Sequence, residues 1–80
     1  MDDTEIEACL LNLAAQRGVK KTFCPSEAAR ALAGDWRPLM PRVRSVAFCL
    51  VAEGRLSVLQ KGEVVSPSNA KGAIRLGAPR

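Results

Sequence analysis

Apolar residues in the first part of the chain recur at intervals of three and four, which is the spacing of a helix with one buried face. The stripe consists of Ile6, Cys9, Leu10, Leu13 and Ala14. Thr4, with Glu7 three residues later, is typical of a capping box at the start of such a helix, and Gly18 is a common helix stop. The pattern therefore predicts a helix over residues 5–17.

A second helix is predicted soon afterwards. Pro25 suits a first helical position, and Glu27 is placed to accept a hydrogen bond from the backbone N–H of residue 24. These signals predict a helix over residues 25–33, ended by Gly34 in the left-handed conformation. Its inward-facing positions are Ala28, Ala29 and Leu32.

The third predicted helix covers residues 37–53, with Asp35 as its cap and Gly54 at its end. Two prolines interrupt its start, because a proline inside a helix removes a hydrogen bond. We therefore expect a first turn around Trp36–Leu39 and a main body from Pro41 to Glu53. The apolar stripe of this helix consists of Leu39, Met40, Val43, Val46, Ala47, Leu50 and Val51.

Beyond the third helix the apolar pattern changes to the alternation of a half-buried strand. Residues 55–60 and 73–76 are expected to pair as an antiparallel hairpin. The long connection over 61–72 is rich in turn formers, and Val64-Val65 within it can extend the pairing. Thr22–Cys24 is expected to add a small third strand.

This order of helices followed by a hairpin is that of a winged helix. The predicted fold class is mainly α with a small β-hairpin, which means a three-helix helix-turn-helix core with a wing over about residues 55–76. A chain of this length forms one small core. We expect residues 1–80 to form a single winged-helix domain, with 77–80 as a frayed tail.

Short strings along most of the chain, from about Ile6 to Leu76, also carry a family resemblance. They are Pro25-Ser26-Glu27-x-Ala29-Arg30-Ala31-Leu32, Trp36-Arg37-x-Leu39-Met40, Val43-Arg44-x-x-Ala47, Gly54-Arg55-Leu56, Gln60-Lys61-Gly62 and Gly72-Ala73-Ile74-Arg75-Leu76. The chain resembles a small bacterial family catalogued as a domain of unknown function and similar to winged-helix proteins. It departs from the pattern of that family at Cys24 and Ala73. The resemblance supports the architecture and implies no chemistry.

Composition excludes several functional classes. The chain has no histidine or tyrosine, no Gly-rich phosphate loop, and three cysteines without a Cys-x-x-Cys pair, so we expect no catalytic residue, no metal site and no cofactor. No apolar run has the length of a membrane span, and the acidic N-terminus differs from a signal peptide. These features predict a non-enzymatic, cytoplasmic protein without a membrane partner.

The charge of the chain points to nucleic acid. The net charge is +4, and residues 1–16 carry four acids and no base, so all twelve Lys and Arg residues lie in the rest of the chain. A basic body favours a polyanionic partner. In the third helix, Arg42, Arg44 and Ser45 occupy the positions from which helix-turn-helix proteins contact DNA. Further candidate phosphate contacts are Lys61 and Lys71 in the wing and Lys20 and Lys21 in the first connector.

A second interpretation is a protein-interaction module, either a homodimer or a domain with a protein partner. Phe48, Cys49 and Ala52 lie opposite the apolar stripe of the third helix, which is unusual for a base-reading face and typical of a contact patch. Alternatively, Phe48 folds back against the second helix or the wing. Any DNA binding is expected to be weak and mainly electrostatic. Three further arginines, Arg30, Arg37 and Arg75, are expected to brace the helical corner by pairing with Glu27, with Asp35 or with helix ends.

Overall fold

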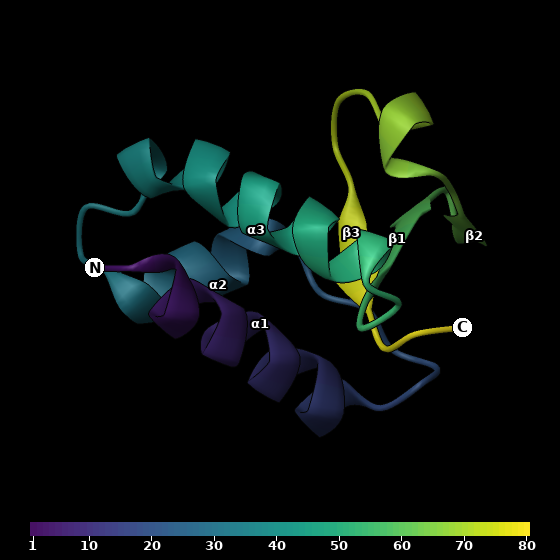
Figure 1. Ribbon diagram of the computed structural model, residues 1–80, viewed down its shortest axis with the longest axis horizontal. Coiled ribbons are helices and arrows are strands. Elements are labelled where there is room, and N and C mark those ends of the chain that lie inside the picture. Colours follow the sequence, from purple (N-terminus) through teal and green to yellow (C-terminus); the bar gives the residue numbers. More distant parts are fainter.

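Three helices and a three-stranded antiparallel sheet make up residues 1–80 in the computed structural model (Figure 1). The elements are α1 (Asp3–Arg17), α2 (Pro25–Leu32), the 3-10 turn η1 (Arg37–Leu39), α3 (Met40–Ala52), β1 (Ser57–Gln60), β2 (Glu63–Val64), the 3-10 turn η2 (Pro67–Asn69) and β3 (Arg75–Gly77). The predicted fold class is confirmed, and the layout agrees with that of a winged helix. None of the helices has both the length and the apolar character needed to cross a membrane.

Helix α1 begins earlier than predicted. The Asp2 carboxylate accepts a hydrogen bond from the backbone N–H of Glu5 at 3.1 Å, and the N–H of Asp2 donates to Glu5 Oε2 at 3.2 Å. This is the capping box, so the assignment of that role to Thr4 with Glu7 was wrong. The end is as predicted, because Gly18 adopts a φ of 77° and its N–H donates to the carbonyl of Ala14.

Helix α2 starts as predicted and ends differently. The N–H of Cys24 donates to Glu27 Oε2 at 3.1 Å, which confirms the expected contact at its first turn. The helix stops at Leu32, and Ala33 leaves it in an extended conformation. Gly34 does not adopt a left-handed conformation, so its predicted role as a stop was wrong.

Helix α3 has the interrupted start that its prolines predict. The η1 turn precedes the regular helix, and Trp36 and Leu39 stand at the caps of the two segments without a side-chain capping bond. Asp35 therefore does not have its predicted capping role. The inward face is confirmed, because Val43, Val46, Ala47 and Leu50 are buried.

The sheet has the order β2-β1-β3, so β1 is central. Val58 of β1 pairs with Leu76 of β3, which confirms the predicted hairpin between distant segments. The connection after β1 is shorter than expected, because a two-residue turn at Lys61-Gly62 leads directly into β2. This strand is the predicted extension of the pairing, and the N–H of Val65 also donates to the carbonyl of Val58 at 2.9 Å.

Phe23 joins the first connector to the sheet. Its N–H and C=O exchange hydrogen bonds of 2.8 Å with Leu76, so the third strand expected at Thr22–Cys24 is a single bridging pair. At the C-terminus, Gly77 belongs to β3, and the N–H of Arg80 donates to Ser57 Oγ at 3.0 Å.

The core lies between the three helices and one face of the sheet. Paired residues on neighbouring strands share a face of the sheet. Val58 and Leu76 face the core, whereas Leu59, the next residue of β1, lies on the other face with its partners Arg75 and Val64. In Figure 1, α3 runs along the top of the view, α1 along the bottom, and the sheet lies at one end. This arrangement places the wing beside α3.

Candidate nucleic-acid interface

Arg44 connects α3 to the wing. Its guanidinium donates a hydrogen bond to the carbonyl oxygen of Gly72 at 3.2 Å. The same guanidinium lies over the ring of Phe48, with its central carbon 5.6 Å from the ring centroid. Phe48 therefore supports Arg44 from the helix side, while the loop before β3 holds it from the other side. The positive charge of Arg44 is thereby held where the helix meets the wing.

The two wing lysines lie on the same hydrogen-bonded framework. The side-chain amide of Gln60 donates to the carbonyl of Lys71 at 2.7 Å and to that of Ala73 at 3.1 Å. This amide ties the loop before β3 to the end of β1, directly next to Lys61. Lys61 and Lys71 both line a groove of about 810 Å³ over this part of the sheet. We call Arg44, Lys61 and Lys71 the basic wing surface.

Positive charge on the basic wing surface is not neutralised by ion pairs. None of its three members forms an ion pair with a carboxylate, and both lysines are exposed. Glu63 lines the same groove and is the one acid among its lining residues. The surface therefore carries a net positive charge and can contact phosphate groups.

Lys61 has an unusual backbone conformation. Its φ is 52°, and it is the one residue other than glycine with a positive φ in residues 1–80. Gly62, with a φ of 80°, completes a two-residue turn between the paired residues Gln60 and Glu63. Such type I′ turns require positive φ at both positions and strongly favour Asn, Asp or Gly. The sequence therefore has a cation at a position where the local conformation favours other residues.

Arg42 and Ser45, also predicted as contacts, are not part of this surface. Arg42 forms an ion pair with Asp3 at 2.8 Å, because the start of α1 lies beside the start of α3. Farther along, Arg55 pairs with Glu7 at 2.8 Å and with Glu53 at 3.3 Å. Two acids of α1 are thus paired with Arg42 on α3 and with Arg55 just beyond its end. Ser45 is exposed on α3.

Lys20 and Lys21 lie in the connector between α1 and α2, and not on α3 or in the wing. Their connector follows the end of α1, away from α3 in Figure 1. It lies against β3, since the Arg75 guanidinium donates to Thr22 Oγ1 at 2.9 Å and to the Thr22 carbonyl at 2.8 Å. Close packing at Gly77 reinforces this contact, because a Cβ there would lie 3.4 Å from the carbonyl oxygen of Lys21.

The three residues of the contact patch predicted on α3, which are Phe48, Cys49 and Ala52, differ in exposure. Phe48 is half-buried and packs against the hydrophobic core, so it does not share the exposure of Cys49 and Ala52. The alternative expectation, in which Phe48 folds back onto the domain, agrees with this packing. The guanidinium over the Phe48 ring, that of Arg44, also donates to the carbonyl of Gly72 in the loop before β3. Cys49 and Ala52 are exposed, as predicted, and Cys49 is a free thiol.

The arginines predicted to brace the helical corner have other partners. Glu27 pairs with Arg17 at 2.5 Å. This hydrogen bond lowers the pKa of the Glu27 carboxyl and raises the pKa of the Arg17 guanidinium. Arg30 and Arg37 instead lie over the Trp36 ring, with central carbons 4.6 and 4.7 Å from its centroid. Sequence reasoning missed this stack, although Trp36-Arg37 in a short interhelical loop was a signal for it.

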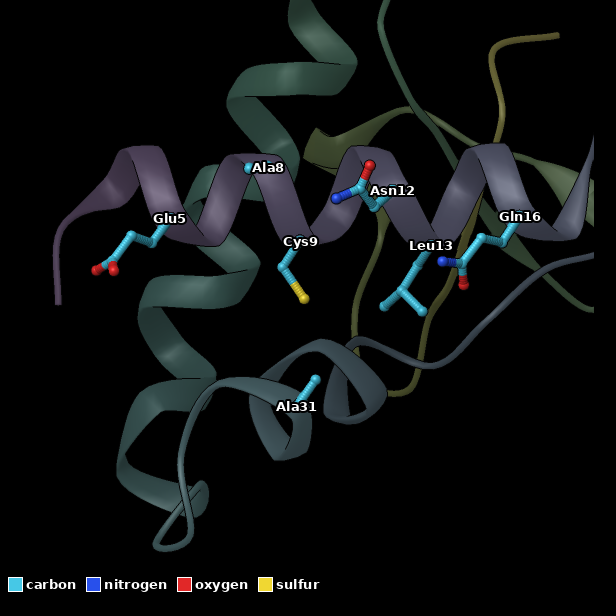
Figure 2. Close-up of a pocket in the computed structure, with 7 residues that line it drawn as sticks. All are labelled: Glu5, Ala8, Cys9, Asn12, Leu13, Gln16 and Ala31. Atoms are coloured by element: carbon cyan, nitrogen blue, oxygen red, sulfur yellow. The ribbon is translucent and has the colours of Figure 1, made fainter.

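A second groove, of about 510 Å³, lies between α1 and α2 (Figure 2). Figure 2 shows Cys9 and Leu13 pointing from α1 toward α2, where Ala31 faces them. The Cys9 thiol donates to the carbonyl of Ala28 at 3.8 Å, and burial raises its pKa, which disfavours the reactive thiolate. No group of three or more His, Cys, Asp or Glu side chains is placed to hold a metal ion.

The chain belongs to a family described as "Protein of unknown function (DUF3253)", whose model matches residues 3–79. The match spans all three helices and the whole sheet. No curated protein matches the chain.

Proposed function

We propose that this member of a family of unknown function is a non-catalytic winged-helix module that binds duplex nucleic acid through its basic wing surface. The observation that carries the proposal is the conformation of Lys61. A non-glycine residue in the left-handed region costs roughly 1–2 kcal/mol, and departures from local preference concentrate at functional sites. A cation at the tip of the wing, without an ion-pair partner, is suited to a phosphate contact.

The geometry of Arg44 supports the same conclusion. One N–H of its guanidinium is used by Gly72, and the remaining donors are available to phosphate oxygens. Lys61 and Lys71 continue the positive surface into the wing. Contacts to phosphates position a protein on a duplex but do not read its sequence.

Low sequence specificity follows from the composition of α3. Its exposed positions include Ser45, Cys49 and Ala52, and only Ser45 has a side chain commonly used to contact base edges. Arg42, which could read guanine, is held by Asp3. We therefore expect weak binding in which electrostatic attraction dominates.

A titration of a short labelled duplex at roughly 50 mM and 200 mM salt tests this proposal. With three phosphate contacts, the logarithm of the association constant should fall with the logarithm of salt concentration at a slope of about −2.7. Lys61→Ala and Lys71→Ala should weaken binding to every duplex about equally, and the control Lys20→Ala should leave it unchanged. Strong discrimination between unrelated duplexes, or no binding at the lower salt concentration, would refute the proposal.

The same proposal includes a cytoplasmic location and a bacterial source. Three free cysteines fit a reducing compartment, and the motif strings are similar to those of a bacterial family.

Self-association through α3 is a second candidate function. The exposed Cys49 and Ala52 are uncharged, and the neighbouring Arg42 is neutralised by Asp3, so apolar contact there meets little electrostatic repulsion. Measurement of the solution mass at the two salt concentrations distinguishes the candidates. An apolar dimer should persist at high salt, whereas nucleic-acid binding should weaken.

A further inference from the structure

Trp36 and two arginines form a cationic stack at the start of α3. Trp36 is half-buried and packs against the core. The guanidinium carbons of Arg30 and Arg37 lie 4.6 and 4.7 Å from its ring centroid, well within the range of a cation–π interaction. Arg30 belongs to the last turn of α2, and Arg37 opens η1. The stack therefore spans the corner between the two helices of the helix-turn-helix.

The hydrogen-bonding capacity of this stack is unused within the protein. Arg30 and Arg37 are exposed, and neither forms an ion pair or a side-chain hydrogen bond. Asp35 lies next to Trp36 in sequence and is not paired with either guanidinium. A purely structural brace accounts for the stacked faces of the two guanidiniums and leaves their N–H edges without a role.

Stacking prepares these N–H edges for a phosphate. The guanidinium is a planar fork that matches the oxygens of a phosphate group. A side chain already held against an aromatic ring loses less conformational freedom when it binds. Trp36 thus fixes two such forks at the surface of the domain.

The location of the stack complements the basic wing surface. Figure 1 shows η1 at one end of α3 and the β1–β2 hairpin toward the other end. We propose that Arg30 and Arg37, held by Trp36, form a second phosphodiester-binding site, so that the backbone of one duplex is contacted at the corner before α3 as well as at the basic wing surface. This inference rests on the proposed function, because it assumes that the duplex lies along α3 and the wing.

The salt dependence of duplex binding distinguishes a protein with one contact region from a protein with two. Arg44, Lys61 and Lys71 alone predict a slope of about −2.7, whereas two further phosphate contacts predict a slope of about −4.5. Arg30→Gln and Arg37→Gln should each weaken binding roughly three- to tenfold at about 0.1 M salt and reduce the slope by about 0.9. Lys20→Gln is the matched control on the connector between α1 and α2 and should change neither quantity.

The wild-type protein provides an independent test, because Trp36 is its only tryptophan and it has no tyrosine. Its fluorescence therefore reports on this stack alone. Addition of a short unlabelled duplex should change the Trp36 emission, with the same midpoint as the anisotropy of the labelled duplex. This measurement needs no variant, so it remains available where an arginine substitution impairs folding, which circular dichroism would reveal.

The outcomes separate this inference from the proposed function. If the duplex binds and the wing variants weaken it, but Trp36 emission and the Arg30→Gln and Arg37→Gln affinities stay unchanged, the second site is refuted and the proposed function stands. If no duplex binds at roughly 50 mM salt, both are refuted. The second site is supported if Trp36 emission changes with the same midpoint as the anisotropy and if the salt slope of binding becomes shallower in both arginine variants.

Discussion

Replacing Lys61 by asparagine is expected to stabilise the domain and, at the same time, to weaken its binding to nucleic acid. Lys61 adopts a φ of 52° in the two-residue turn that ends at Gly62. Asparagine tolerates this conformation better than lysine, and Asn-Gly is the preferred sequence for such a turn. We expect Lys61→Asn to raise the free energy of unfolding by about 0.5–1 kcal/mol, which corresponds to an increase in Tm of roughly 2–8 °C for a domain of this size.

The same change removes one positive charge from the basic wing surface. The salt slope for duplex binding should become shallower by about 0.9, and the affinity at about 0.1 M salt should fall roughly three- to tenfold. Stability is measured by thermal unfolding followed by circular dichroism, and binding is measured by anisotropy of a labelled duplex. Opposite changes in these two quantities would show that one side chain reduces stability and promotes binding.

Two control variants separate the contributions of conformation and charge. Lys61→Ala removes the charge without favouring positive φ, so it should weaken binding without the gain in stability. Lys71→Asn removes a charge at a residue whose φ is not positive, so it should also weaken binding without stabilising the turn. If Lys61→Asn is no more stable than Lys61→Ala, the reasoning about the turn is refuted. If it is more stable and binds as well as the wild type, Lys61 is not a phosphate contact.

Two further substitutions test the packing and the charges around the helices. Phe48→Glu should lower the free energy of unfolding by about 1–3 kcal/mol, because a half-buried ring is replaced by a charge. The control is Cys49→Glu, at the exposed neighbouring position. Equal stability of the two variants in thermal unfolding would contradict the observed packing. Glu27→Gln should flatten the loss of stability in acid. The pKa of Glu27 is lowered in the folded state by Arg17, so its contribution is present above the unfolded-state pKa of about 4.3 and is lost as the pH falls through the lower, folded-state value. The free energy of unfolding is measured at a series of pH values, with Glu63→Gln as the control. If Glu27→Gln loses stability in acid as steeply as the wild type, the role of the Glu27–Arg17 pair is refuted.

Local signals in the sequence were sufficient to predict most of the fold. Periodicity located the three helices, and alternation located the strands of the hairpin. The errors arose where two positions carry the same signal, or where the residue present is not typical of the local structure that it forms. Asp2 with Glu5 and Thr4 with Glu7 are both capping-box signatures, and the earlier pair forms the cap. The turn at Lys61-Gly62 was missed because lysine is not a typical residue for it.

The candidate site was less predictable, because its partners are distant in sequence. The proximity of Arg44 to Gly72 and the pairing of Arg42 with Asp3 depend on how α3 packs against the wing and α1. No spacing rule reports such contacts. For the same reason, the sequence suggested that Arg30 pairs with an acid, whereas in the folded protein it lies over Trp36.

The bridge between Phe23 and Leu76 affects how this domain folds during synthesis. It joins the first connector to the last strand, and Phe23, Ile74 and Leu76 are buried together in the core. While the chain emerges from the ribosome, the helices are complete before β3 is available to close this core. Contacts between segments so far apart in sequence form late and slowly, and partly exposed apolar surface promotes aggregation. We therefore expect a chain that ends before Leu76 to lack the strand that pairs with Phe23 and to expose part of its apolar core.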